Sequence, residues 1–127
     1  MSKSVLYTED KSKMKYDIPE VTEYGGLAVV RAPGSLEKDD AERIRSIMLN
    51  CLNNGNTQLA LDMEAVPYIN SDGLRMIQDV LRQAESLEAS LALVNANSRV
   101  LRTLNITRLD TQVAVYASID EAIRQNS

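Results

Sequence analysis

Apolar residues recur along this chain in two alternating patterns, short continuous runs and stripes with helical spacing. Short, mainly apolar runs are typical of strands that are buried on both faces of a sheet. Such runs occupy residues 27–32, 59–63, 91–94 and 113–115. Stripes spaced by three and four residues are typical of amphipathic helices. Such stripes occupy residues 41–52, 74–87 and 100–104.

Two further elements complete the pattern. Residues 18–21 fit a short edge strand, since Pro19 is tolerated at an edge, and Gly25-Gly26 predicts a hairpin turn into the next strand. Residues 118–121 match a capping box and predict a final helix that ends near Gln125. Strands and helices therefore alternate, which predicts an α/β fold with a mixed, mainly parallel sheet of about four to five strands and about four helices.

Composition narrows the function classes. Residues 1–16 are polar and include four lysines, so we expect a flexible N-terminal arm or edge segment there and one domain over 17–127. The formal net charge is −4, which argues against a nucleic-acid partner. No apolar run reaches about 18 residues and no signal-type apolar segment opens the chain. We therefore expect a cytoplasmic protein without direct membrane insertion.

The chain lacks the residues of the common catalytic sites. Histidine is absent and Cys51 is the only cysteine, which excludes Ser-His-Asp and Cys-His nucleophiles and His-ligated metals. Cys51 falls on a predicted apolar helix face, so we expect a small buried hydrophobe. Asp62 and Glu64 resemble a carboxylate pair, but without a His or Lys partner we expect solvated or capping roles. We predict no enzyme, no metal and no cofactor.

The segment 66–74 joins a predicted strand to a predicted helix. Asn70, Ser71 and Asp72 favour a helix N-cap or first turn. Ser71 is therefore expected at the exposed positive end of a helix dipole, where a phosphate on its hydroxyl would meet a favourable field. From spacing alone, a simple capping role for Ser71 is the commoner explanation.

Four segments in this order resemble the STAS domain, which occurs in sulfate-transporter tails and in anti-sigma factor antagonists. Residues 34–37 resemble its G-x-L-D turn, 59–63 its central strand, and 69–74 its D-S-[ST]-G-L element. Residues 93–109 resemble its late strand, helix and T-G-L turn. The resemblance covers roughly residues 17–125 and implies the STAS fold.

The resemblance also implies a function. In the antagonist branch, a kinase that is also the anti-sigma factor phosphorylates the first serine of this element, and a serine phosphatase resets it. Ser71 occupies that position, so the resemblance implies a phosphorylation-regulated anti-sigma factor antagonist in a partner-switching pathway. The expected partner-binding residues lie on two loops: Ser35, Leu36, Glu37, Tyr68, Ile69, Asn70, Ser71, Asp72 and Gly73.

Several of these residues have a structural alternative. Glu37 suits the first turn of a helix, where a negative charge is favourable. Gly73 suits tight packing between helix and strand, and Tyr68 and Ile69 suit a loop that closes over the core. Both kinds of role stay open at the level of the sequence.

Three positions depart from the family pattern. Asn70 stands for the family's Asp, Asp72 for its second Ser or Thr, and Arg108 for the Gly of T-G-L.

Two alternative functions follow from the same resemblance. One is a non-catalytic STAS subunit that docks on a membrane transporter ATPase, and the other is a module that binds a nucleotide or small ligand.

Overall fold

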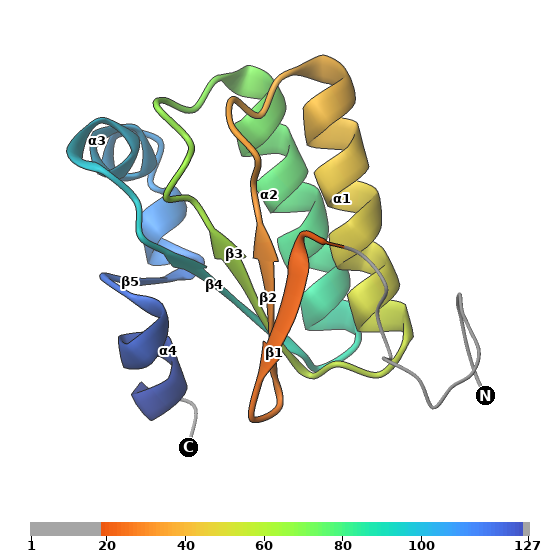
Figure 1. The fold of residues 1–127 in the computed structure, drawn as a ribbon. Coiled ribbons are helices and arrows are strands. Elements are labelled where there is room, and N and C mark those ends of the chain that lie inside the picture. The colour runs from red at the N-terminus through yellow and green to blue at the C-terminus, as the bar shows by residue number, and fades with distance from the viewer. Residues whose placement is uncertain (1–18, 126–127) are drawn as a thin grey trace.

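The computed structural model describes residues 19–125 (Figure 1). Its elements follow the expected alternation of strands and helices. They are β1 (Val21–Tyr24), β2 (Leu27–Arg31), α1 (Lys38–Asn53), β3 (Gln58–Asp62), α2 (Ser71–Ser86), β4 (Ser90–Val94), α3 (Ser98–Ile106), the 3₁₀ helix η1 (Leu109–Thr111), β5 (Ala114–Tyr116) and α4 (Ile119–Gln125). The expected arm over 1–16 and the contribution of Ile18 to the first strand lie outside the described residues.

The five strands form one sheet in the order β1-β2-β3-β4-β5. β1 pairs antiparallel with β2, and the other three pairs are parallel. Gly25 and Gly26 both have positive φ, at 54° and 97°, as a tight hairpin between β1 and β2 requires. The predicted mixed, mainly parallel sheet is confirmed.

The core lies mainly on one face of the sheet. Side chains of successive strand residues alternate between the faces, so Leu61 points toward the helices α1, α2 and α3, while Ala60 points toward α4. Figure 1 shows α1 and α2 side by side along one face, with α4 on the other. None of the helices in residues 19–125 has the length and apolar character needed to cross a bilayer.

The boundaries of β2 to β5 differ from the predicted ones by one residue, whereas β1 begins at Val21, three residues later than predicted. β5 begins at Ala114, where its pairing with β4 begins, and Val113 is buried just before it. The capping box at the start of α4 is half formed. Ser118 Oγ accepts from the Glu121 N–H, but the Glu121 carboxylate accepts from the N–H of Ala117 instead of closing on Ser118.

Candidate functional site

Three loops gather at one edge of the sheet. Parallel strands end at the same edge, so the segments 32–37, 63–70 and 95–97 leave β2, β3 and β4 side by side. In Figure 1 this edge is at the top, with the start of α2 between the starts of α1 and α3. All of the partner-binding residues expected from the sequence lie on the first two loops or in the first turn of α2.

The helix α2 begins with Asn70 as its N-cap. Asn70 Oδ1 accepts from the Gly73 N–H at 3.1 Å. Ser71 is the first helical residue and is exposed. The expected position of Ser71 at an exposed helix start is confirmed, but the interpretation of Ser71 as the cap is wrong. Asn70 satisfies the orphan donor, so the Ser71 hydroxyl is not needed as a cap.

Asp72 links the starts of two helices. Its Oδ2 accepts from the backbone N–H of Lys38 at 3.0 Å, at the first residue of α1. The Asp72 side chain is half-buried. This carboxylate therefore ties the loop after β2 to the first turn of α2, directly beside Ser71.

Tyr68 forms a second link between the same two loops. Its hydroxyl donates to Glu37 Oε2 at 2.8 Å, and the carboxylate of Glu37 raises the pKa of Tyr68 above its ordinary value. The guanidinium carbon of Arg99, in the first turn of α3, lies 5.5 Å from the centroid of the Tyr68 ring, within the range of a cation–π contact. Ser35 and Arg99 act on this pKa in the opposite direction, and more weakly.

Three of the expected partner-binding residues pack beneath this surface. Leu36 and Ile69 are 1% and 7% exposed. A Cβ added to Gly73 would lie 2.9 Å from Ile69 Cγ1 and 3.3 Å from Leu36 Cβ. Gly73 therefore allows a close approach of the helix to the loop, and the structural alternative describes both Gly73 and the buried side chain of Ile69.

Asn97 fixes α3 against the loop that carries Tyr68. Its Oδ1 accepts from the Val100 N–H at 2.8 Å and so caps α3. Its Nδ2 donates to the carbonyls of Val66 and Pro67 at 3.1 and 3.2 Å. Neither Asn97 nor Arg99 was predicted from the sequence as a residue of this site. The available signal was that the predicted third helix starts at the same edge as the segment 66–74.

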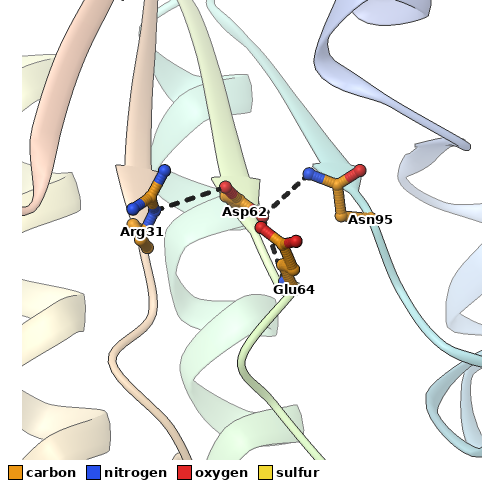
Figure 2. Close-up of polar contacts among 4 residues, drawn as sticks. All are labelled: Arg31, Asp62, Glu64 and Asn95. Atoms are coloured by element: carbon orange, nitrogen blue, oxygen red, sulfur yellow. Dashed lines mark hydrogen bonds and ion pairs between the residues drawn. The ribbon is translucent and has the colours of Figure 1, made fainter.

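The buried Asp62 ties the ends of three strands together, as Figure 2 shows. Its Oδ1 accepts from the Glu64 N–H and from Asn95 Nδ2, each at 3.0 Å. Its Oδ2 lies 3.6 Å from Arg31 Nε. The solvated role expected for Asp62 is wrong, since Asp62 is 1% exposed, and its bond from the Glu64 N–H closes a turn after β3 and caps no helix.

Asp62 lies on the face of the sheet opposite α2. It follows Ala60 by two residues, and Ala60 packs toward α4. The Asp62 carboxylate therefore points away from the helix that carries Ser71. Within residues 19–125, no group of three or more His, Cys, Asp or Glu side chains could hold a metal ion.

A hollow of about 100 Å³ adjoins this edge between α1 and α2, and Lys38, Asp72 and Arg75 are among its lining residues. Small-molecule sites usually measure about 300–1,000 Å³. The hollow is therefore smaller than a nucleotide needs, which disfavours the ligand-binding alternative at this position.

Comparison with known proteins identifies the fold family. The STAS domain matches residues 19–122. A Thermotoga neapolitana protein, "Putative anti-sigma factor antagonist TM1081 homolog", is 38% identical over 74 residues, which cover 58% of this chain and 66% of that protein. A Thermotoga maritima protein named "Putative anti-sigma factor antagonist" is 35% identical over the same length. The matched segment thus spans just under two thirds of these relatives.

Solved structures agree on the fold. A crystal structure of a "putative anti-sigma factor antagonist" from Thermotoga maritima has a TM-score of 0.78 at 26% identity, with 83% of this chain and 91% of that one covered. The STAS domain of a SulP transporter from Vibrio cholerae has a TM-score of 0.66 at 22% identity, with 80% of each chain covered. Both regulator and transporter STAS domains therefore share this architecture. The chain belongs to the STAS domain family.

Proposed function

We propose that this protein is an anti-sigma factor antagonist whose activity is switched by phosphorylation of Ser71. The unphosphorylated form binds an anti-sigma factor that is also a serine kinase, and the phosphorylated form is released. A serine phosphatase restores binding, and the whole cycle takes place in the cytoplasm. In this cycle the protein is a substrate and a ligand and does not itself catalyse a reaction.

The exposed Ser71 at the first position of α2 carries the proposal. A phosphoserine bears about −1.5 to −2 charges at neutral pH. At a helix N-terminus this charge faces backbone N–H groups and the positive end of the helix dipole, so the fold tolerates it. At an interface the same charge is costly to desolvate. Phosphorylation can therefore abolish binding and leave the protein folded.

The surface around Ser71 supplies the proposed contact. Glu37, Tyr68 and Asp72 each bridge neighbouring segments of this edge through the bonds described above. These bridges hold the loops around Ser71 in one arrangement before a partner arrives, which lowers the entropic cost of binding. The buried Leu36 and Ile69 support the same loops from below.

The first test is the mass of the protein purified from its native host. Trypsin cleaves after Arg45 and Arg75, so Ser71 lies in a peptide of residues 46–75 that also contains Ser46. We expect one phosphate, located on Ser71 by fragmentation of this peptide. Phosphate on Ser46 alone, or no phosphate under any growth condition, would contradict the proposal.

The second test measures retention of the partner. We expect Ser71→Ala to keep a copurifying kinase bound and Ser71→Glu to release it, because the added charge lies at the interface. Ser46→Ala and Ser46→Glu are the matched controls, since Ser46 is exposed on α1 and should leave binding unchanged. Release by Ser46→Glu as well would show a general effect of charge, against the proposal.

The alternative is a non-catalytic STAS subunit that docks on a membrane transporter ATPase, since the STAS fold also occurs in a transporter, the SulP transporter from Vibrio cholerae. The identity of the copurifying protein separates the two functions. A soluble kinase supports the antagonist, and a membrane transporter that binds Ser71→Ala and Ser71→Glu equally supports the docking subunit.

A further inference from the structure

The outer face of α3 is positively charged, whereas the protein as a whole has a negative net charge. The chain as a whole has a formal net charge of −4, but residues 97–109 contain three arginines and no acidic residue. Arg99, Arg102 and Arg108 are all exposed. Within residues 19–125, none of the three pairs with a carboxylate. This basic surface is therefore uncompensated within the part of the chain that the structure describes.

Exposed apolar side chains accompany these arginines. Among the described residues, the large hydrophobic side chains that are exposed are Tyr24, Tyr68, Leu87, Leu101 and Ile106. Two of them are on α3, and Ile106 is 71% exposed. A third, Tyr68, contacts Arg99 at the start of that helix. Apolar groups gathered in this way on a surface mark interaction sites.

The geometry joins these groups into one stripe. Arg99, Arg102 and Ile106 are separated by three and four residues, so they share one face of α3. Tyr68 extends this stripe to the loop that leads into α2, three residues before Ser71. Asn97 holds the start of α3 on the same loop through the carbonyl of Val66. The stripe is therefore continuous with the surface around Ser71 and is fixed in position relative to it.

The opposite side of the same edge carries the opposite charge. Residues 37–42, at the start of α1, contain four acidic residues and one lysine. Because β3 lies between β2 and β4 in the sheet, Ser71 stands between an acidic helix start and a basic one. A ligand of uniform charge, such as a nucleic acid or an anionic membrane, would meet repulsion at the acidic side. A protein surface with both charges can match both sides.

We infer that the stripe Tyr68–Arg99–Arg102–Ile106 is the second half of the partner-binding surface and that it receives an acidic, partly apolar segment of the partner protein. This inference rests on the proposed function, because it assigns a chemistry to the partner that docks at Ser71. It also explains the direction of the switch. A phosphate on Ser71 adds negative charge next to the position where the acidic segment of the partner docks, and like charges repel it.

The test compares two charge reversals. The probe is the protein retained by Ser71→Ala, identified by mass spectrometry, produced separately and titrated at two salt concentrations. Arg102→Glu and Arg82→Glu each change the formal net charge from −4 to −6. Arg82 is exposed on α2, where it pairs with Asp79 on the same helix. We expect Arg102→Glu to weaken binding by roughly tenfold and to reduce its salt dependence, and Arg82→Glu to change it less than about twofold.

A photo-crosslinking amino acid at position 106 locates the contact. We expect it to capture a partner peptide rich in Asp and Glu, while the same group at position 87, at the far end of α2, captures none. Equal affinity of Arg102→Glu and Arg82→Glu, with Ser71→Glu still releasing the partner, would overturn the inference and leave the proposed function intact. If Ser71→Glu does not release the partner while Arg102→Glu still weakens binding, the proposed function is overturned.

Two other outcomes would replace the protein partner by another occupant. Binding of the purified protein to phosphatidylglycerol vesicles, lost on Arg102→Glu, would assign the stripe to a membrane surface. Binding to a duplex DNA of random sequence, lost on the same substitution, would assign it to a nucleic acid. Either result would overturn the inference of an acidic protein segment.

Discussion

Asp62 offers a quantitative test of how the candidate edge is held together. Both of its hydrogen bonds, from the Glu64 N–H and from Asn95 Nδ2, end on the same oxygen, Oδ1. Its ion pair with Arg31 uses the other oxygen, is longer at 3.6 Å, and involves an Arg31 side chain that is 65% exposed. The geometry therefore assigns most of the stabilisation to Oδ1 as an acceptor.

The expected magnitudes follow from this assignment. A hydrogen bond to a charged group contributes about 1.5–3 kcal/mol, so Asp62→Ala, which removes two, should lower the free energy of unfolding by about 3 kcal/mol or more. Asp62→Asn keeps one acceptor oxygen for both donors. It loses the charge and replaces Oδ2, which faces Arg31, by an NH₂ donor, at about 1–2 kcal/mol. Arg31→Gln should lower it by less than about 1 kcal/mol, because the Arg31 side chain is largely exposed, its contact with Asp62 is long, and both hydrogen bonds to Oδ1 remain.

The assay is urea unfolding at pH 7, followed by circular dichroism, with the midpoint and slope compared between variants. Asp79→Ala serves as the control, because its partner Arg82 is 72% exposed, and it should cost less than about 1 kcal/mol. An Asp62→Asn variant as unstable as Asp62→Ala would refute the reasoning. It would show that the carboxylate charge, and not the shared acceptor, stabilises the edge.

Three further predictions concern the same edge and the turn after α3. Gly73→Ala should lower the free energy of unfolding by about 1 kcal/mol, because the clash with Ile69 outweighs the better helix propensity of alanine; a more stable variant would contradict the close approach. Arg108→Gly should raise it by about 0.5–1 kcal/mol, because Arg108 has φ 65°, and thermal unfolding measures the change. Glu37→Gln should lower the pKa of Tyr68 toward its ordinary value, and a pH titration followed by NMR of labelled tyrosine measures that pKa. Because the pKa is raised in the folded protein, the contact with Glu37 stabilises the fold at neutral pH. This stabilisation is lost as the pH rises through the pKa of Tyr68.

Local patterns were sufficient to predict most of the fold. The run 59–63 was apolar enough to indicate a buried strand, and the spacing of Ile44, Met48 and Cys51 indicated one helix face; all three are buried in α1. Glycine pairs and capping residues marked the turns. Arg108 stands where the family pattern has Gly, and it nevertheless adopts the αL conformation that glycine favours.

The side-chain contacts of the edge could not be predicted in the same way. Tyr68 and Glu37 are 31 residues apart in the sequence, and Asp72 and Lys38 are 34 apart. The spacing of apolar residues along the sequence does not indicate such pairs, because each pair depends on how two loops meet after the sheet has formed. Asp62 shows the same limit. An Asp within a mainly apolar run was expected in a solvated or capping role, but Asp62 is buried and shares its face of the sheet with Ala60, which packs toward α4.

Two helix starts in residues 19–125 share one motif, an Asn cap followed by an exposed Ser, and only one of them is proposed as a switch. Asn70 caps α2 and Asn97 caps α3, and the next residue in each case, Ser71 or Ser98, is exposed. A cap motif alone would therefore predict two phosphorylation sites. The residue that follows the serine differs, an acid after Ser71 and the basic Arg99 after Ser98.

The charges next to each serine allow a kinase to distinguish Ser71 from Ser98. A kinase that also docks through an acidic segment would place that segment on Arg99 and its neighbours, which covers Ser98 and leaves Ser71 facing the active site. Phosphate on Ser71 and none on Ser98, in the protein treated with its purified kinase, is the expected result. Equal phosphorylation of both serines would mean that the kinase reads only the cap, and that the surrounding surface does not select the site.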